Sequence, residues 1–354
     1  MFGLFVEHGP LIITKDLQAK LRKYTWANEY NVIYFDNPVG TGFSFTDNDS
    51  GYATNESDVA RDLYEALQQF FTVFHEYNKT DLYITGESYA GKYVPSIAYK
   101  IHSEGSNSGL NLKGIAIGDG LCDPESMLDY GDFLFQIGLI DEKQLALFKE
   151  QQQLTLSKIK SKSYLEAFKV WDQLLNGDLI NGTSYFYNYT GLKFYYNYLY
   201  TIQPDDFSYY SGYLGLQGTR KALHVGNIEF KEGNTVETHL VNDIMQSVKP
   251  WVEVLVNNYK VLVYSGQLDI IVAAPLTESF VNTMNWKYAN EYKNADRLIW
   301  KVSPEDTEVA GYVRQVHDFY QIIVRNAGHI LPYDQPRVAY DMIRRFINNQ
   351  GFKK

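Results

Sequence analysis

The spacing of apolar residues predicts helices and buried strands that alternate in the first third of the chain. Between Ser57 and His75 apolar residues recur every three or four positions, which indicates an amphipathic helix capped by Ser57 or Asn55. Short apolar runs bounded by turn residues are typical of buried strands. On these grounds we expect strands at 31–36, 81–85 and 112–120, and a second helix at 92–103.

The middle of the chain breaks this alternation, because long helical patterns and a Tyr-rich stretch (184–200) replace it. The alternation then returns, with a helix at 247–259, strands at 260–266, 297–303 and 319–328, and a last helix from about Pro336. Alternating strands and helices favour an α/β fold, with a mostly parallel central sheet and helices on both faces. We therefore expect a core of residues 1–121 and 241–354, into which residues 122–240 are inserted as a helical cap.

Composition narrows the choice of function. The 354 residues are enough for one large α/β domain with an insertion. A net charge of −10, without a Lys/Arg-rich run, disfavours a nucleic-acid partner. No apolar run reaches the roughly 18 residues that a membrane-spanning helix needs, so we expect no membrane partner. The first ten residues show neither a basic leader nor a cleavage site, and we expect no signal peptide in this chain.

The cysteine, histidine and asparagine residues indicate which metal, cofactor and glycosylation sites the chain could contain, and which cellular compartment suits it. Cys122 is the single cysteine, which rules out an intrachain disulfide and a cysteine-based metal cluster. The histidines show no metal-ligand spacing, and no dinucleotide or phosphate-loop motif occurs, so we expect neither a metal nor a cofactor. Five Asn-x-Ser/Thr sequons favour a secretory route and are candidate glycosylation sites: Asn48, Asn55, Asn78, Asn181 and Asn188.

Three polar residues follow predicted strands and could form one catalytic site. Ser88 lies in Gly-Glu-Ser-Tyr-Ala-Gly, between a strand and a helix, where small neighbours permit a strained turn. Asp269 and His329 each come just after a later strand, in "YSGQLD" and "AGHILP". The carboxyl ends of parallel strands meet at one edge of the sheet, and the order Ser, Asp, His is that of α/β-hydrolases. The sequence therefore predicts a nucleophile, its base and an orienting carboxylate.

The motifs "TGESYAGKYVP", "DNPVGTGFSF", "YSGQLD", "AGHILPYDQP", "ALHVGN" and "IAIGDGLCDP" extend through essentially the whole chain. With them the chain resembles the serine carboxypeptidases, most closely the vitellogenic-carboxypeptidase-like members. The resemblance implies an α/β-hydrolase fold with a helical cap, peptide or protein C-termini as substrates, a preference for acidic pH, and a lysosomal or secreted location. It maps the catalytic triad onto Ser88, Asp269 and His329, and an oxyanion-hole N–H onto Tyr89.

The same resemblance assigns Glu87 and Glu7 to recognition of the substrate's terminal carboxylate. Two close carboxyl groups resist double ionisation, so one stays protonated and can donate a hydrogen bond to an anion. The alternative is that Glu7 is a solvated charge near the start of the chain.

The chain departs from the family pattern in one respect: the Gly-Gly-Pro-Gly segment expected just before residue 1, which supplies another oxyanion donor, does not occur. Loss of one such donor costs about a hundredfold or more in rate. Two alternatives to an active carboxypeptidase therefore stay open. One is a catalytically impaired homologue that acts as a binding or scaffold protein, and the other is an esterase or acyltransferase that uses the same triad.

Overall fold

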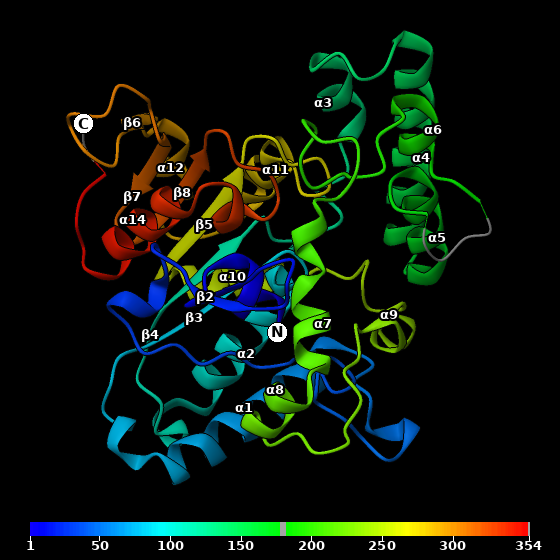
Figure 1. The fold of residues 1–354 in the computed structure, drawn as a ribbon. Helices are drawn as coiled ribbons and strands as arrows, with labels where there is room; N and C mark the ends of the chain where they lie inside the picture. The colour runs from blue at the N-terminus through cyan, green and yellow to red at the C-terminus, as the bar shows by residue number, and fades with distance from the viewer. Residues whose placement is uncertain (178–181, 353–354) are drawn as a thin grey trace.

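The computed structural model describes residues 1–177 and 182–352. A six-stranded sheet in the order β3-β4-β5-β8-β7-β6 forms its centre (Figure 1). The first four of these strands run parallel to one another, and the last two continue the sheet antiparallel. The strands are β3 (Leu82–Glu87), β4 (Leu112–Gly118), β5 (Lys260–Gly266), β8 (Phe319–Val324), β7 (Gly311–Val316) and β6 (Leu298–Trp300). The mostly parallel sheet expected from the sequence is confirmed.

Side chains of the central strands are buried on both faces of the sheet. In β4, Ile115 and Ile117 enter one core, while Ala116 between them enters the other. In β5, Val263 and Tyr264 divide between the same two cores. Successive residues of a strand point to opposite faces, so a strand covered on both sides has a continuous apolar sequence. This explains why these strands were recognisable as short apolar runs.

Helices cover both faces, as the sequence indicates. Four helices contribute to the larger core on one face: α1 (Glu56–Val73), α2 (Ala90–Glu104), α10 (Lys249–Val256) and α11 (Ala274–Thr283). The other face is covered by α14 (Pro336–Ile347), whose Phe346 packs edge-on against the rings of Tyr83 and Tyr320. In Figure 1 the sheet lies between α2 and α10 on one side and α14 on the other.

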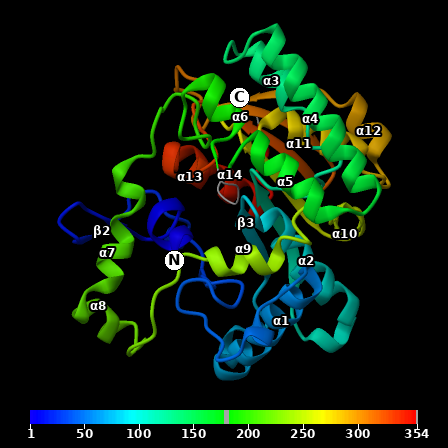
Figure 2. The same cartoon turned by 90° about the vertical axis from the view of Figure 1, so that its right-hand side faces the viewer.

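The segment between β4 and β5 is helical and has no strand among its described residues. Helices α3 to α6 form a group at one side of the molecule, and α7 and α8 lie apart from them (Figures 1 and 2). The helices are α3 (Tyr130–Gln136), α4 (Glu142–Lys160), α5 (Tyr164–Leu174), α6 (Tyr185–Thr190), α7 (Tyr209–Gly215), α8 (Gln217–Ala222) and α9 (Asn234–Leu240). Phe194 and Phe207, between α6 and α7, pack with Val6 and Ile330 of the body.

The prediction of a buried strand at residues 31–36 is wrong. These residues belong to no strand, and Ile33 and Phe35 are 41% and 39% exposed. An apolar run becomes a strand only when a neighbour completes its hydrogen-bond ladder. Within residues 1–177 and 182–352, none pairs with this run. The sequence analysis also missed β7 and the hairpin of β1 (Leu11–Ile13) and β2 (Ala19–Leu21).

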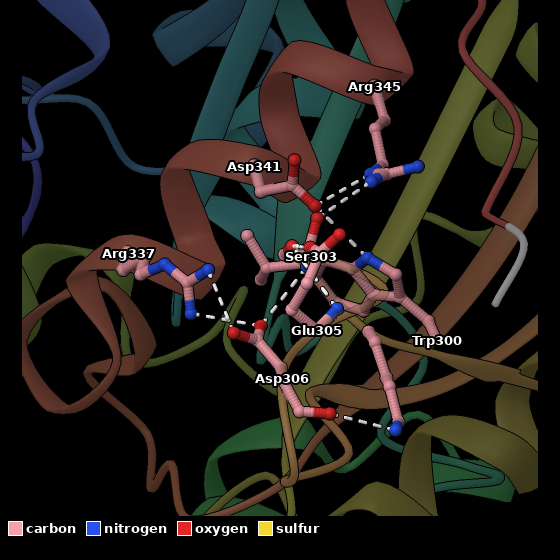
Figure 3. A network of polar contacts seen from close by, with 9 residues as sticks. Trp300, Ser303, Glu305, Asp306, Arg337, Asp341 and Arg345 are labelled. Carbon is pink, nitrogen blue, oxygen red and sulfur yellow. Dashed lines mark hydrogen bonds and ion pairs between the residues drawn. The ribbon is translucent and has the colours of Figure 1, made fainter.

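A polar network fastens the last helix to the antiparallel end of the sheet (Figure 3). Asp341 of α14 accepts hydrogen bonds from the Trp300 indole at 3.1 Å and from Arg345 at 2.6 Å. Arg337, also on α14, forms an ion pair with Asp306 in the loop after β6. Because Asp341 is buried and its charge is paired, the network fixes α14 against the sheet.

The glycosylation candidates occupy different settings. Asn48, Asn78 and Asn188 are exposed. Asn55 is half-buried and caps α1, because its side chain accepts the Asp58 N–H at 3.0 Å. Asn181 lies outside the described residues.

A second buried polar cluster joins the two helices that lead to and from β3. Lys92 of α2 is fully buried, and its Nζ lies 3.1 Å from the carboxylate of Asp243. Ser96, one turn further, donates to Glu56 at the start of α1 at 2.8 Å. Burial raises the pKa of Glu56 to about 7, although the Lys92 charge and the Ser96 hydroxyl oppose the rise.

Glu56 is expected to make the fold less stable as the pH rises. The unfolded carboxyl loses its proton near pH 4.5 and the folded one near 7. The contribution of Glu56 is therefore complete below pH 4.5 and is lost as the pH rises to 7, by about 3 kcal/mol. Urea unfolding at acidic and neutral pH should show this component vanishing in Glu56→Gln and persisting in Glu65→Gln, an exposed control on the same helix. An unchanged pH dependence in Glu56→Gln would contradict the assignment.

Candidate active site

Ser88 occupies a strained turn between β3 and α2. Its φ of +64° lies in the left-handed region that non-glycine residues rarely adopt. Small neighbours make the turn possible. A Cβ on Gly86 would come within 2.5 Å of the Cβ of Ala90, and one on Gly91 within 2.5 Å of the Leu121 nitrogen. The turn therefore projects the Ser88 side chain from the carboxyl edge of the sheet, as the motif predicts.

The three residues predicted to act together do meet. His329 Nε2 lies 2.7 Å from Ser88 Oγ, and His329 Nδ1 lies 2.8 Å from Asp269 Oδ2. The side chains of His329 and Asp269 are fully buried, while Ser88 is half-buried. The other carboxylate oxygen of Asp269 accepts the Val272 N–H at 3.2 Å. An imidazole held in this way can take a proton from the serine hydroxyl while the carboxylate orients it.

Residues of the helical segment between β4 and β5 contact His329, a feature that the sequence analysis missed. The His329 N–H donates to the Tyr196 carbonyl at 2.6 Å, and the Tyr196 ring stacks on the imidazole with centroids 4.6 Å apart. The Asp334 carboxylate accepts the Gly328 N–H at 2.6 Å and the Asn197 amide at 3.0 Å. Gly328 and His329 are thus held on one side by Asp334, a few residues later, and on the other by Tyr196, more than a hundred positions earlier. Asp334 stands within the "AGHILPYDQP" motif, but the Tyr-rich stretch gives no comparable signal.

Glu7 and Glu87 lie close enough to interact electrostatically, although they are 80 positions apart. Burial raises the pKa of Glu7 to about 7, against the opposing effect of positive charges that include Arg22. Burial also raises the pKa of Glu87 well above its usual range, and the charges of Glu7 and Asp269 raise it further. The Tyr264 phenol is another neighbour that affects the pKa of Glu87. The alternative to carboxylate recognition, that Glu7 is a solvated charge, does not hold, because its side chain is only 16% exposed.

A short π-helix holds Glu7 in place. The element η1 (Gly3–Glu7) is fastened by Arg22, which donates to the carbonyls of Phe5 at 2.7 Å and Gly9 at 2.9 Å. His8, next to Glu7, stacks on the Trp26 indole with centroids 3.8 Å apart. Burial lowers the pKa of His8 to about 3, so this ring is neutral at physiological pH. The neighbouring histidine therefore brings no positive charge to Glu7.

Tyr89 follows the nucleophile at the N-terminus of α2. The first N–H groups of a helix have no partner within the helix and point towards an approaching anion. The Ser88 carbonyl is engaged by the N–H groups of Gly91 and Leu121, at 2.9 and 3.1 Å, which holds the turn in position. These two bonds fix the backbone next to Tyr89, the residue whose N–H the sequence analysis expects to serve the oxyanion.

Among the described residues, one group of His and carboxyl side chains is compact enough to share a metal ion: Asp119, Asp269 and His329. In this group both ring nitrogens of His329 already contact Ser88 and Asp269. The arrangement can therefore be explained as acid–base machinery for a serine nucleophile.

In the part of the chain that the structure describes, no helix is both long and apolar enough to cross a membrane.

Comparison with protein families places the chain among enzymes of known class. A family model described as serine carboxypeptidase matches residues 1–349. The "Probable serine carboxypeptidase CPVL" of Homo sapiens is 54% identical, and the match covers 99% of this chain and 75% of that protein. The "Venom serine carboxypeptidase" of Apis mellifera is 46% identical over 99% of this chain and 76% of its own length.

A solved structure supports the fold assignment. The prohormone-processing carboxypeptidase Kex1Δp of Saccharomyces cerevisiae superposes with a TM-score of 0.84 at 23% identity. The match covers 98% of this chain and 80% of the yeast chain. At this level of identity the likeness concerns the fold, which is that of the α/β-hydrolases predicted from the sequence.

Proposed function

The chain belongs to the serine carboxypeptidase family, and we propose that it releases C-terminal residues from peptides by means of Ser88, His329 and Asp269. The observation that carries the proposal is the unbroken chain of contacts from Ser88 Oγ through the His329 ring to Asp269 Oδ2, at 2.7 and 2.8 Å. A serine hydroxyl becomes an effective nucleophile when a neighbouring imidazole accepts its proton.

The proposed reaction has two halves. In the first, Ser88 Oγ attacks the carbonyl carbon of the last peptide bond while His329 takes the hydroxyl proton, and the Tyr89 N–H stabilises the oxyanion. His329 then gives that proton to the departing amino group, which leaves an acyl ester on Ser88. In the second half His329 removes a proton from water, which attacks the ester carbonyl carbon. His329 then gives that proton to Ser88 Oγ as the acyl–oxygen bond breaks and the shortened peptide leaves. Asp269 holds the imidazole in the tautomer that both halves require.

Exopeptidase specificity is assigned to Glu7 and Glu87. A protonated carboxyl group can donate a hydrogen bond to the carboxylate at the end of a peptide, whereas two ionised ones would repel it. The raised pKa of each group favours the protonated form at acidic pH. We therefore propose that the pair recognises the terminal carboxylate and gives the enzyme its preference for acidic conditions.

The remaining proposals concern location and the cap. An acidic optimum and exposed sequons at Asn48, Asn78 and Asn188 fit a lysosomal or secreted glycoprotein. We propose that residues 122–240 act as the cap over a core of residues 1–121 and 241–354. The contacts of Tyr196 and Asn197 with residues 328–334 support a cap that also shapes the site.

A peptide with a free C-terminus is expected to lose its last residue, and its amidated counterpart to react much more slowly. The efficiency kcat/KM on the free peptide should fall about tenfold for each pH unit above 7, because Glu7 ionises with a pKa near 7. An ester substrate without a free carboxylate should lose less. Mass spectrometry of the products, together with kinetics at acidic and alkaline pH, measures both effects.

The matched variants are Glu7→Gln, which keeps a neutral donor at every pH, and Glu76→Gln, an exposed control. Glu7→Gln should flatten the difference between the two substrates, and Glu76→Gln should behave like the unmodified protein. An equal decline on both substrate types would remove the role proposed for the pair. Removal of internal fragments, instead of single terminal residues, would contradict the exopeptidase assignment.

A further inference from the structure

Asp119 is a buried acid that the proposed mechanism leaves without a role. It follows directly after β4, the strand that lies between those leading to Ser88 and Asp269. The residue is completely buried, and its φ of +42° is unusual for a residue with a side chain. Strained backbone and a buried carboxyl at the same position, beside the site, call for a specific function.

One oxygen of Asp119 has a clear partner and the other has none. Oδ1 accepts the Gly266 N–H at 2.8 Å, which fastens the end of β4 to the end of β5. The residue's own N–H donates to the Tyr264 carbonyl at 2.7 Å. Oδ2 is buried and receives no hydrogen bond from any N–H or O–H group of the described residues. A buried carboxylate oxygen without a donor is costly, but a protonated one can itself donate.

The acceptor available to such a donor is the carboxylate of Asp269. Ligating atoms of Asp119, Asp269 and His329 all lie within 4.8 Å of one another, and the charge of Asp269 has the largest effect of any neighbouring charge on the Asp119 carboxyl group. Neighbouring carboxyl groups in a buried site resist double ionisation, so a proton retained by one of them can be donated to the other.

The surroundings decide which acid holds the proton. Asp269 accepts from Val272 on one oxygen and faces His329 Nδ1 with the other, so both of its oxygens already have partners. Asp119 has one N–H donor, and the groups around it are Asp269, Glu87, Tyr264 and His329. Burial raises the pKa of Asp119 well above its usual range, and the charges of Asp269 and Glu87 raise it further.

We propose that Asp119, in its protonated form, is a positioning residue that donates its carboxyl O–H to Asp269 and so holds the Asp269 carboxylate against His329. The inference rests on the proposed function, since it assigns Asp119 to the same triad. The proton stays between the two carboxyl groups throughout the reaction. Asp119 therefore stabilises the orientation of Asp269 without adding a second negative charge beside the imidazole.

Two substitutions separate this role from a structural one. Asp119→Asn keeps an acceptor for Gly266 and supplies a permanent N–H donor to Asp269, and asparagine tolerates a positive φ. Asp119→Ala removes both groups. Asp341→Asn is the control, because Asp341 is also buried but belongs to the network around α14. Each variant is assayed with a p-nitrophenyl ester that lacks a free carboxylate, so that Glu7 and Glu87 do not dominate the pH profile.

The proposal predicts that Asp119→Asn keeps kcat within a few-fold and that Asp119→Ala lowers kcat about ten- to hundredfold with little change in KM. The acid limb of the kcat/KM profile should move to higher pH, slightly in the Asn variant and further in the Ala variant. The reason is that an Asp269 carboxylate with a weaker donor holds the His329 proton more tightly. A purely structural role predicts an unmoved limb in every folded variant.

An acid limb that coincides with that of the unmodified protein in both variants would overturn the proposal. So would an Asn variant that loses as much kcat as the Ala variant. If Asp119→Ala does not fold, the acid limb of the kcat/KM profile of Asp119→Asn alone tests the proposal. Reaction of the unmodified protein with a fluorophosphonate distinguishes failure of the proposed function from failure of the Asp119 role alone. If that protein neither labels nor hydrolyses the ester, the proposed function fails and the role of Asp119 falls with it. If it does both, unmoved limbs refute the Asp119 role alone.

Discussion

Replacing Ser88 by alanine is expected to lower kcat for the release of C-terminal residues by about a millionfold, to the level that binding alone supports. The change removes one oxygen, and with it the acyl-enzyme route through which His329 and Asp269 act. Because alanine is smaller than serine and the turn is already formed by Gly86 and Gly91, the fold should persist. Residual activity is measured from the products by mass spectrometry over long incubations.

The control for this variant is Ser103→Ala, an exposed serine on α2 that donates to the Tyr99 carbonyl. It should keep the activity of the unmodified protein, and thermal unfolding should show that both variants are folded. A folded Ser88→Ala protein with more than about a thousandth of the original kcat would show that Ser88 is not the nucleophile.

Asp269→Asn is expected to lower kcat about 10⁴-fold while KM changes little. An amide in place of the carboxylate can present an N–H to His329 Nδ1, and the ring then adopts the tautomer in which Nε2 carries the proton. In that tautomer His329 cannot accept the Ser88 proton across the 2.7 Å contact. The shape of the site is retained, because asparagine can still accept the Val272 N–H.

The comparison that decides this prediction is Asp123→Asn. Asp123 is also buried, but its partners are Lys249 and Ser126, neither of which belongs to the triad. Its substitution should reduce the free energy of unfolding and leave kcat per folded molecule unchanged. Equal kcat values for the two variants would place the effect of Asp269→Asn in folding and not in catalysis.

The elements found correctly from the sequence are those whose local pattern agrees with their final surroundings. Strands β4 and β5 are covered on both faces, so their continuous apolar runs match their burial. Helix α1 has an apolar stripe at helical spacing and a capping side chain at Asn55. The Ser88 turn is recognisable because only small residues fit on both sides of it. Each of these signals is local, so it can be recognised from the sequence without knowing which distant residues the segment contacts.

The features that were missed depend on partners distant in the chain. Residues 31–36 have the composition of a strand, but strand formation also requires a neighbour. Strand β7 mixes buried residues with half-buried and exposed ones and includes Arg314 and Gln315, so it lacks an apolar run. Asp119 and Tyr196 gain their importance from packing beside Asp269 and His329, about 150 and 130 positions away. A buried acid at the end of a strand between two catalytic strands is the signal that could have identified Asp119.

Activation of Ser88 by His329 is tested most directly by intact-mass analysis of the protein after reaction with a fluorophosphonate. The reagent forms a stable adduct with a serine whose proton a neighbouring base removes. We expect one adduct on the unmodified protein at both acidic and neutral pH, and none on Ser88→Ala. A folded, unmodified protein without an adduct, or an adduct that persists in Ser88→Ala, would contradict the activation of Ser88 by His329.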